Sequence, residues 1–352
     1  MKPPAHLPLR RALLTWYDQN RRDLPWRRTC DPYHIWISEI MLQQTRVAAV
    51  IPRYEEFLLR FPSVQKLAAA RESAVLAQWS GLGYYRRARN LHTAAKIIAR
   101  EKIFPQNAEA WRTLPGIGRY TAAAIASIAF AEPVAVVDGN VERVLQRLAG
   151  SALTSKDLWQ RAQWQLSPSR PADFNQAMME LGAMVCTPRQ PKCDACPIRN
   201  WCATQGESPR TTPPQSQSRK EIWHTLDQRG GHIRMVQRPA KSSLMAGMWE
   251  LPPAEPSITS NLKSSPAAKR RKITAHGASR ESAAPASRAP NGRKNGHETS
   301  WRTFRHSITV TNYTVHVICS PAARGQWMPI ERISDVPITG LTRKILKAAG
   351  II

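Results

Sequence analysis

The sequence predicts a mainly α-helical first domain, residues 1–204, and a smaller α+β domain, residues 222–352, joined by a linker at 205–221. Three observations lead to this prediction. Apolar residues recur at helical spacing through most of residues 7–204, the alternation typical of strands begins only after residue 221, and Pro, Ser, Thr and Gln dominate the stretch between. A length of 352 residues also fits two domains.

The expected helices of the first domain follow one another closely. The clearest start is Asp31-Pro32, because Asp is a favoured N-cap and Pro is favoured in the first turn. We expect helices over residues 33–43, 68–79, 88–100, 108–114, 120–130, 141–149 and 173–184. No segment of this half alternates as a half-buried strand would.

The second domain has a different pattern. Alternation predicts strands over residues 222–226, 232–237, 302–309 and 312–318, and residues 341–349 are expected to form a closing helix. Residues 253–300 are rich in Pro, Ala, Ser, Lys and Arg, so they cannot bury enough apolar surface to fold. We therefore expect a disordered insertion there.

A Gly-rich turn precedes the helix expected at residue 120. The run Leu114-Pro115-Gly116-Ile117-Gly118 is a tight hairpin that leaves backbone N–H groups free at the start of this helix. Such an end attracts anions, and the neighbouring Arg119 makes a DNA phosphate a plausible ligand. An ordinary turn, with Asp138 capping the next helix, explains the same residues, and the hairpin alone leaves both interpretations open.

Four of the six cysteines lie within one short segment, spaced C-x6-C-x2-C-x5-C. They are Cys186, Cys193, Cys196 and Cys202. Four thiolates at this spacing suit one tetrahedral metal ion or one iron–sulfur cluster. We favour the cluster because zinc ribbons usually pair two C-x2-C knuckles and this segment has one. Cys30 and Cys319 are distant, so we interpret them as small hydrophobic residues rather than ligands.

Composition limits the classes of partner. Lys and Arg number 51 against 25 Asp and Glu, a net charge of +26, which indicates a polyanionic partner. Basic ribosomal and membrane-surface proteins share such a charge, so it indicates nucleic acid only together with the motifs. No apolar run approaches the ~20 residues that cross a bilayer. The start of the chain has no signal-peptide pattern, so we expect a cytoplasmic protein, associated with the nucleoid if it is bacterial.

Two carboxyl groups are candidates for acid–base chemistry. Glu39 has apolar helical neighbours, Ile35, Trp36 and Leu42, so desolvation should raise its pKa toward neutrality. Asp138 next to Gly139 should cap a helix and stay ionised. Such a pair suits hydrolysis of an N-glycosidic bond, in which one group protonates the leaving base and the other stabilises a cationic sugar. The alternative for Glu39 is a buried ion pair with an arginine.

These motifs together resemble the helix-hairpin-helix DNA glycosylases that hold a [4Fe–4S] cluster. Within that group they most resemble the adenine DNA glycosylase (MutY) family. The segments that carry this closer resemblance are 22–27 (RDLPWR), 38–45 (SEIMLQQT), 81–85 (GLGYY) and 137–140 (VDGN). The resemblance is dense over about residues 10–204. It is weaker in the second half, where residues 247–252 and 304–307 resemble the Nudix-like C-terminal domain of that family.

The resemblance implies roles for named residues. Glu39 would be the general acid at adenine N7 and later handle the water, and Asp138 would stabilise the sugar cation, with Asn140 and Tyr120 beside it. One [4Fe–4S] cluster would be bound by the four cysteines. The implied substrate-binding positions are Arg22, Trp26, Arg27, Leu42 and Gln176 at the adenine, Gln44 and Tyr84 at the duplex around the 8-oxoguanine, Gly116 and Gly118 in the hairpin, Thr309 at the lesion, and also Gln43. Without the motif, Trp26 and Tyr84 would be interpreted as core aromatics.

Two departures from the family pattern concern the second half: the loop that contacts 8-oxoguanine and the unusual length of the insertion at 253–300. Family members commonly have Phe-Ser-His in the loop that contacts 8-oxoguanine, whereas this chain has Ile308-Thr309-Val310. Thr309 keeps a hydroxyl, but the aromatic ring and the imidazole are gone. We also find no Glu-rich metal-binding helix of active Nudix hydrolases in residues 219–352. The expected Nudix-like domain should therefore recognise a lesion rather than hydrolyse a nucleotide.

The predicted function is a monofunctional adenine glycosylase. Its partner would be double-stranded DNA containing adenine opposite 8-oxoguanine or guanine, bound by a monomer. One alternative is an endonuclease III-like glycosylase and lyase for oxidised pyrimidines. That relative has Lys where this chain has Tyr120, because Schiff-base chemistry needs an amine. A second alternative is a non-catalytic iron–sulfur protein that binds DNA, against which the presence of both Glu39 and Asp138 argues.

Overall fold

Two compact units make up the chain, Met1–Pro213 and Pro214–Ile352, and each is described by itself. The structure, a computed structural model, describes residues 6–207, 218–239, 241–242, 244–254, 302–308 and 311–352. Within these residues no helix is both long enough and apolar enough to span a membrane.

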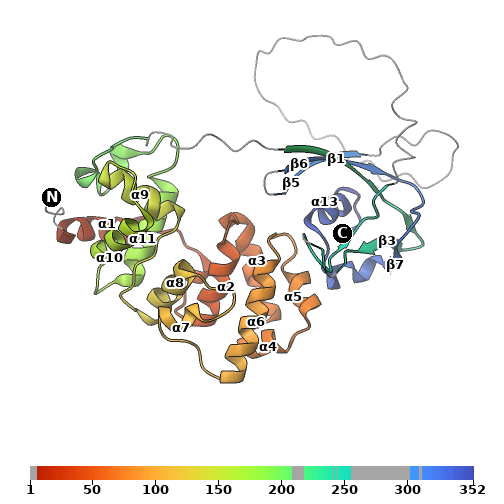
Figure 1. Ribbon diagram of the computed structural model, residues 1–352, viewed down its shortest axis with the longest axis horizontal. Helices are drawn as coiled ribbons and strands as arrows, with labels where there is room; N and C mark the ends of the chain where they lie inside the picture. Colours follow the sequence, from red (N-terminus) through yellow and green to blue (C-terminus); the bar gives the residue numbers. More distant parts are fainter. Residues whose placement is uncertain (1–5, 208–217, 240, 243, 255–301, 309–310) are drawn as a thin grey trace, which may run out of the picture. The chain divides into compact units, whose positions relative to one another are not determined.

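The first unit is helical, and its described residues form no strand, as predicted. Figure 1 shows the helices in two groups, with α1, α9, α10 and α11 together and α2–α8 together. The elements are α1 (His6–Asn20), η1 (Pro25–Arg27), α2 (Pro32–Leu42), α3 (Val47–Arg60), α4 (Val64–Ala69), α5 (Glu72–Gln78), α6 (Arg86–Glu101), α7 (Ala108–Arg112), α8 (Arg119–Phe130), α9 (Gly139–Ala149), α10 (Ser155–Gln165), α11 (Pro171–Met184), η2 (Cys193–Ala195) and η3 (Arg199–Trp201).

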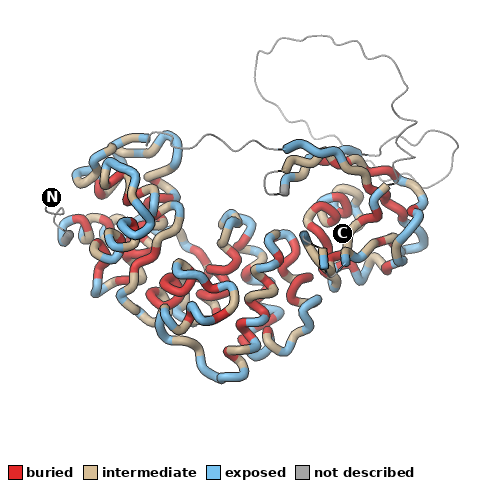
Figure 2. Tube along the Cα trace, in the orientation of Figure 1, coloured by how far each residue is buried: buried red, intermediate tan, exposed pale blue. Residues whose placement is uncertain are grey.

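Each group encloses its own apolar interior, which is the buried part of the tube in Figure 2. Leu13 and Tyr17 of α1 pack there against Leu145 of α9 and Leu181 of α11. Trp36, Trp79 and Trp111 are fully buried in the other group. Helix α11 contacts both α9 and α8, so it joins the two groups.

The prediction of a single helix over residues 68–79 is wrong. The chain instead forms α4 and α5, with Ala70 and Arg71 in extended conformation between them. The apolar period does not reveal this break, because Leu67 before it and Val75 after it both face the core. The other expected helices of this unit match observed ones to within a few residues.

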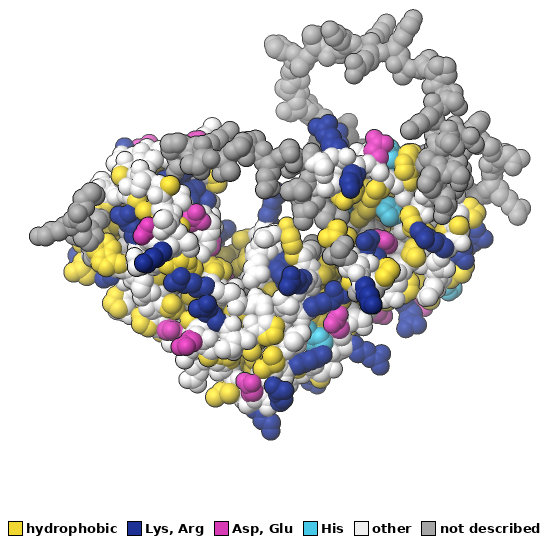
Figure 3. Space-filling model, viewed as in Figure 1, with side chains coloured by type: hydrophobic (Ala, Val, Ile, Leu, Met, Phe, Trp, Pro, Cys, Tyr) yellow, Lys and Arg dark blue, Asp and Glu magenta, His cyan; other side chains and the backbone are white. Residues whose placement is uncertain are grey.

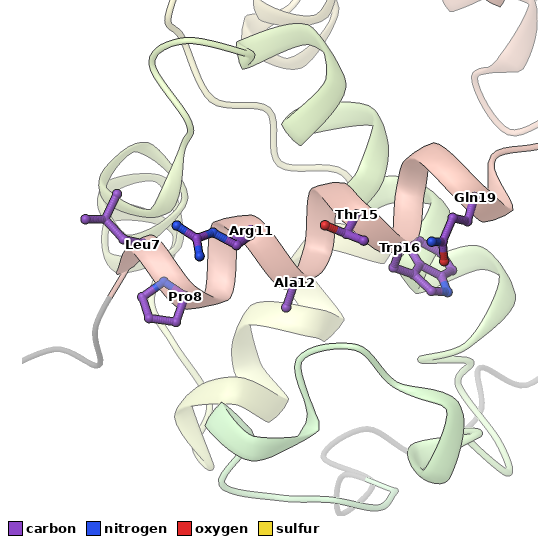
Figure 4. Close-up of a pocket in the computed structure, with 7 residues that line it drawn as sticks. All are labelled: Leu7, Pro8, Arg11, Ala12, Thr15, Trp16 and Gln19. Carbon is purple, nitrogen blue, oxygen red and sulfur yellow. The ribbon is translucent and has the colours of Figure 1, made fainter.

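One face of α1 is open to solvent. Its residues line a shallow cavity of about 500 Å³, and their side chains follow one side of the helix in Figure 4. They are Leu7, Pro8, Arg11, Ala12, Thr15, Trp16 and Gln19. The opposite face packs Leu9 and Leu13 into the core, which explains the helical period of this segment.

The described residues of the second unit form two small sheets. In the first, with order β1-β6-β5, β1 runs parallel and β5 antiparallel to β6; in the second, β3 pairs with β2, β4 and β7. The elements are β1 (Ser218–Thr225), β2 (Gln228–Arg229), β3 (His232–Gln237), β4 (Trp249–Glu250), β5 (Arg302–Ile308), β6 (Thr311–Ile318), β7 (Gln326–Pro329), η5 (Ile330–Asp335) and α13 (Gly340–Ala348). Ile233, Val315 and Ile345 belong to its core.

The structure of this unit differs from the sequence prediction in several places. Strand β1 begins at Ser218 rather than at residue 222, and β2, β4 and β7 were not expected because two to four residues are too few to show alternation. Of the insertion expected at 253–300, only residues 253–254 are described, and Pro253 bridges to His224. The rest of that segment, and Thr309, lie outside the described residues.

Candidate active site

A cavity of about 620 Å³ lies within the first unit, where η1, α2, α8, α11 and the start of α9 meet. It brings together eleven residues that the sequence singled out. They are Arg22, Trp26, Arg27, Glu39, Leu42, Gln43, Gln44, Tyr120, Asp138, Asn140 and Gln176. Tyr84, Gly116 and Gly118 are not part of its lining.

Glu39 lies on α2 and is 6% exposed. Its Oε2 atom is buried with no hydrogen-bond partner among the described residues. Burial raises the pKa of Glu39 to about 7; the nearby Tyr120 hydroxyl and Arg27 oppose this change, and Asp138 adds to it. Glu39 forms no ion pair in the described part of the chain, so the alternative of a structural pair with arginine is wrong.

Asp138 is the N-cap of α9, as predicted. Its Oδ1 accepts hydrogen bonds from Asn140 N at 2.9 Å and Val141 N at 2.7 Å, and its Oδ2 accepts one from Asn140 Nδ2 at 3.0 Å. An acceptor surrounded by donors suits an ionised carboxylate. The two carboxyl groups therefore line one cavity in opposite environments.

Tyr120 on α8 faces both carboxyl groups. Burial first, and then the nearby Glu39 and Asp138, raise the pKa of its phenol well above the usual value. Its hydroxyl donates to Met179 Sδ at 3.3 Å. Tyr120 therefore remains a neutral phenol at neutral pH.

Glu180 on α11 is the most important cavity residue that sequence reasoning missed. It is 1% exposed and accepts hydrogen bonds of 2.6–3.0 Å from Arg22 N, Nε and Nη2 and from Arg27 Nη1 and Nη2. Burial alone would raise the pKa of Glu180, but the bonds from Arg22 and Arg27 outweigh it and hold the pKa at about 2. The available signal was that Glu180 follows Gln176 by one helical turn, so both share a face of α11.

Arg143 connects the Asp138 cap to the cysteine segment. Its Nη2 donates to Asn140 Oδ1 at 2.8 Å and to Gly182 O at 2.6 Å, and its Nε donates to Cys186 O at 2.8 Å. Asn140 in turn bonds Asp138. Arg143 therefore links the N-cap region of α9 to the last turn of α11 and to the first cysteine of the segment.

The four clustered cysteines line one small cavity and are all half-buried. Arg147 Nη1 donates to Cys186 Sγ at 3.3 Å, and Gln205 N lies 3.5 Å from Cys202 Sγ, so N–H groups face two of the sulfurs. Within the described residues, no three Cys, His, Asp or Glu side chains are placed to hold a single metal ion. Four cysteine thiols that line one cavity suit an iron–sulfur group. Cys30 and Cys319 are exposed and do not line this cavity.

Gln44 and Tyr84 share an unusual backbone. Their φ angles are 54° and 47°, a left-handed conformation that costs a non-glycine residue about 1 kcal/mol or more. Tyr84 lies outside the cavity and is 49% exposed, so the alternative of a core aromatic is wrong for it. Trp26, in contrast, is buried, lines the cavity, and makes an edge contact with Tyr54 at a centroid distance of 5.4 Å.

The hairpin before α8 has the predicted form. Gly116 has a φ of 79°, and a Cβ there would lie 2.6 Å from Asn90 Cβ, so only glycine fits. Gly118 is the N-cap of α8, and a Cβ there would meet nothing within 4 Å, so the helix start faces open space. Arg119 stacks on Trp159 of α10, with its guanidinium 3.8 Å from the ring centroid.

Comparison with known proteins assigns the family. Residues 37–168 match the sequence model of the HhH-GPD superfamily base excision DNA repair proteins, and residues 186–202 match the iron-sulfur binding domain of endonuclease III. A solved structure titled as a thermostable thymine-DNA glycosylase is 32% identical, with a TM-score of 0.54 over 57% of this chain and 96% of that chain. The chain belongs to the HhH-GPD superfamily.

Curated relatives of this superfamily member carry a narrower name. Human adenine DNA glycosylase is 39% identical over 310 residues, which is 69% of this chain and 57% of that protein. The mouse adenine DNA glycosylase is 49% identical over 210 residues, which is 55% of this chain and 41% of that protein. The chain thus spans less than two thirds of these relatives' length. The resemblance to adenine DNA glycosylases and the presence of an iron–sulfur binding segment at 186–202 are confirmed.

Proposed function

We propose that this protein is a monofunctional DNA glycosylase, which hydrolyses the N-glycosidic bond of adenine paired with 8-oxoguanine or guanine. The observation that carries the proposal is the buried carboxyl of Glu39, whose Oε2 has no hydrogen-bond partner among the described residues, in the same cavity as the capped carboxylate of Asp138. The names of the curated relatives support adenine as the base.

The two carboxyl groups would divide the reaction between them. With a pKa of about 7, a large fraction of Glu39 is protonated near neutrality and can donate its proton to N7 of the departing adenine. Asp138 stays available as an anion beside the sugar, whose transition state resembles an oxocarbenium ion. After the base leaves, ionised Glu39 can accept a proton from the attacking water.

The cavity walls would select the base. A glycosylase must extrude its target nucleotide and hold the base between apolar and hydrogen-bonding groups. Trp26 and Leu42 offer apolar surface, and Gln176 offers an amide that can both donate and accept hydrogen bonds. Gln44 and Tyr84 would enter the duplex and fill the gap left by extrusion, offsetting part of an unstacking cost of a few kcal/mol.

The DNA backbone would bind at the hairpin and over the basic surface. Gly116 makes the turn before α8, and at Gly118, the N-cap of α8, the missing Cβ leaves open space beside the start of the helix, where a phosphate is favoured. Figure 3 shows that Lys and Arg outnumber Asp and Glu on the visible face, in agreement with the net charge of +26. Binding should therefore weaken steeply with salt.

The second unit would be a Nudix-like domain for lesion recognition, with Thr309 at the lesion. Its mixed sheet and closing helix α13 are compatible with this assignment. We further expect the protein to act as a monomer in the cytoplasm, as the sequence predicts.

The proposed cofactor is one [4Fe–4S] cluster, held by Cys186, Cys193, Cys196 and Cys202. Such a cluster would tie together the segment after α11, and its role would be structural because all four ligands come from the chain. Protein purified without oxygen should be brown and contain about four irons per chain. Metal analysis checks this expectation, and one equivalent of zinc without iron would contradict it.

The function is tested by excision from a duplex with adenine opposite 8-oxoguanine. We expect release of adenine and an intact strand that breaks only after alkali, because the Tyr120 phenol cannot form the imine that a lyase needs. A duplex with thymine opposite guanine is the matched control substrate, and its thymine should be released at least tenfold more slowly than the adenine, a difference of about 1.4 kcal/mol in the barrier. Strand scission without alkali, together with borohydride trapping, would favour the lyase alternative.

A further inference from the structure

Gln44 and Tyr84 lie in two separate loops, and both loops place a non-glycine residue in left-handed conformation. The first loop follows α2, and the second precedes α6. Each such residue persists only where its surroundings determine the conformation. The side chain of Arg87, on the first turn of α6, contacts both loops.

Arg87 donates to oxygen atoms of both segments. Its Nη1 bonds the α2 end and its Nη2 bonds mainly the second loop, at distances of 2.5–3.2 Å. The acceptors are Ile40 O, Met41 O and Gln43 O for Nη1, and Thr45 Oγ1, Leu82 O and Gly83 O for Nη2. The guanidinium also lies 5.5 Å from the Tyr84 ring centroid and 5.4 Å from that of Trp79.

We propose that Arg87 is a positioning residue that holds the Gln44 and Tyr84 loops in one arrangement ready to enter a DNA duplex. This inference rests on the proposed glycosylase function and adds a residue that does not line the cavity. The contacts support it because Gln43 and Thr45 flank Gln44, while Gly83 precedes Tyr84. The polar partners of Arg87 thus lie beside Gln44, within two residues before Tyr84, or in the last turn of α2.

The chemistry of arginine explains why one side chain can do this. A planar guanidinium presents several donors in fixed directions, whereas an ammonium is a compact point charge. A cation at the C-terminal carbonyls of α2 is also favoured by the helix dipole. Burial lowers the pKa of Arg87 to about 10, which still leaves it charged at neutral pH. Lysine at this position would keep the charge and lose the bridge.

The test measures base extrusion separately from binding. Arg87→Lys is made in a Glu39→Gln background, with 2-aminopurine replacing the target adenine opposite 8-oxoguanine. We expect the fluorescence rise on extrusion to fall at least tenfold, while duplex affinity changes less than threefold. In the background with Glu39 intact, excision should fall about 10–100-fold, as small misplacements do. The matched control is Arg89→Lys, also on α6, where Arg89 pairs with Glu72 on the surface.

Further measurements distinguish a positioning role of Arg87 from misfolding and from a failure of the proposed function. A melting temperature within a few degrees of wild type shows that Arg87→Lys folds. A Tyr84→Ala, Arg87→Lys double variant should lose less extrusion than the sum of the two single losses, because Arg87 acts in part through the Tyr84 loop. Extrusion equal to that of Arg89→Lys, or fully additive losses, would overturn the role of Arg87. A wild-type protein that excises nothing would instead overturn the proposed function.

Discussion

Replacing Glu39 by Gln is expected to slow adenine excision by about 10²–10⁴-fold, the usual contribution of a general acid. The amide fills the same space but has no proton to give to the departing base. The same change should stabilise the fold at neutral pH, because burial raises the pKa of Glu39 from 4.5 to about 7. As the pH rises from 4.5 to 7, the contribution of Glu39 therefore lowers the free energy of unfolding by about 2–3 kcal/mol in total. Single-turnover kinetics and urea unfolding check the two effects.

Asp138→Asn is the matched control for this prediction. Asn is also a good N-cap, so α9 should keep its start, but the negative charge beside the sugar is lost. We expect a comparable loss of excision without the gain in stability. The pH profile adds a signature, because wild-type excision should decline above pH 7 as Glu39 ionises, and the residual rate of Glu39→Gln should lack that decline. An active and unstable Glu39→Gln protein would contradict the assignment of this residue.

Replacing Glu180 by Gln is expected to lower the free energy of unfolding by about 3–5 kcal/mol, as breaking a buried ion pair on one side does. The change leaves Arg22 and Arg27 without their shared anion. The control is Glu56→Gln, since Glu56 is 50% exposed and pairs with Arg53 on the surface. That pair should contribute about 0–1 kcal/mol. Equal effects of the two changes in urea unfolding would contradict the structural importance of Glu180.

The ion pairs of Glu180 with Arg22 and Arg27 also predict that the stability of the fold depends on pH in the acid range. The pKa of Glu180 is lowered in the fold, from 4.5 to about 2, so its stabilisation is complete above pH 4.5 and is lost as the pH falls toward 2. The wild-type protein should therefore lose stability more steeply than Glu180→Gln over this range. Unfolding measured at several pH values between 2 and 5 checks this dependence.

The parts of the site that local sequence determines were predictable. Asp138 caps α9 through the next three residues, and the desolvation of Glu39 follows from its own helical neighbours. Glu180 was not predictable in the same way, because its partners Arg22 and Arg27 lie more than 150 residues earlier. The break between α4 and α5 also escaped, since both helices present apolar residues to one core. Pairings that depend on tertiary contacts leave no local period in the sequence.

The pairing of Arg22 with Glu180 spans 158 residues, and α1 packs on α11. A chain emerging from the ribosome therefore completes its hairpin, residues 114–118, well before the cavity can close. Translation at about 5–20 residues per second leaves several seconds between the two events. During that interval the nascent chain would have the hairpin proposed to bind phosphate, but not the complete cavity proposed to hold a base. With the proposed function, excision would require the chain through α11, so a chain interrupted before that helix would create no abasic sites.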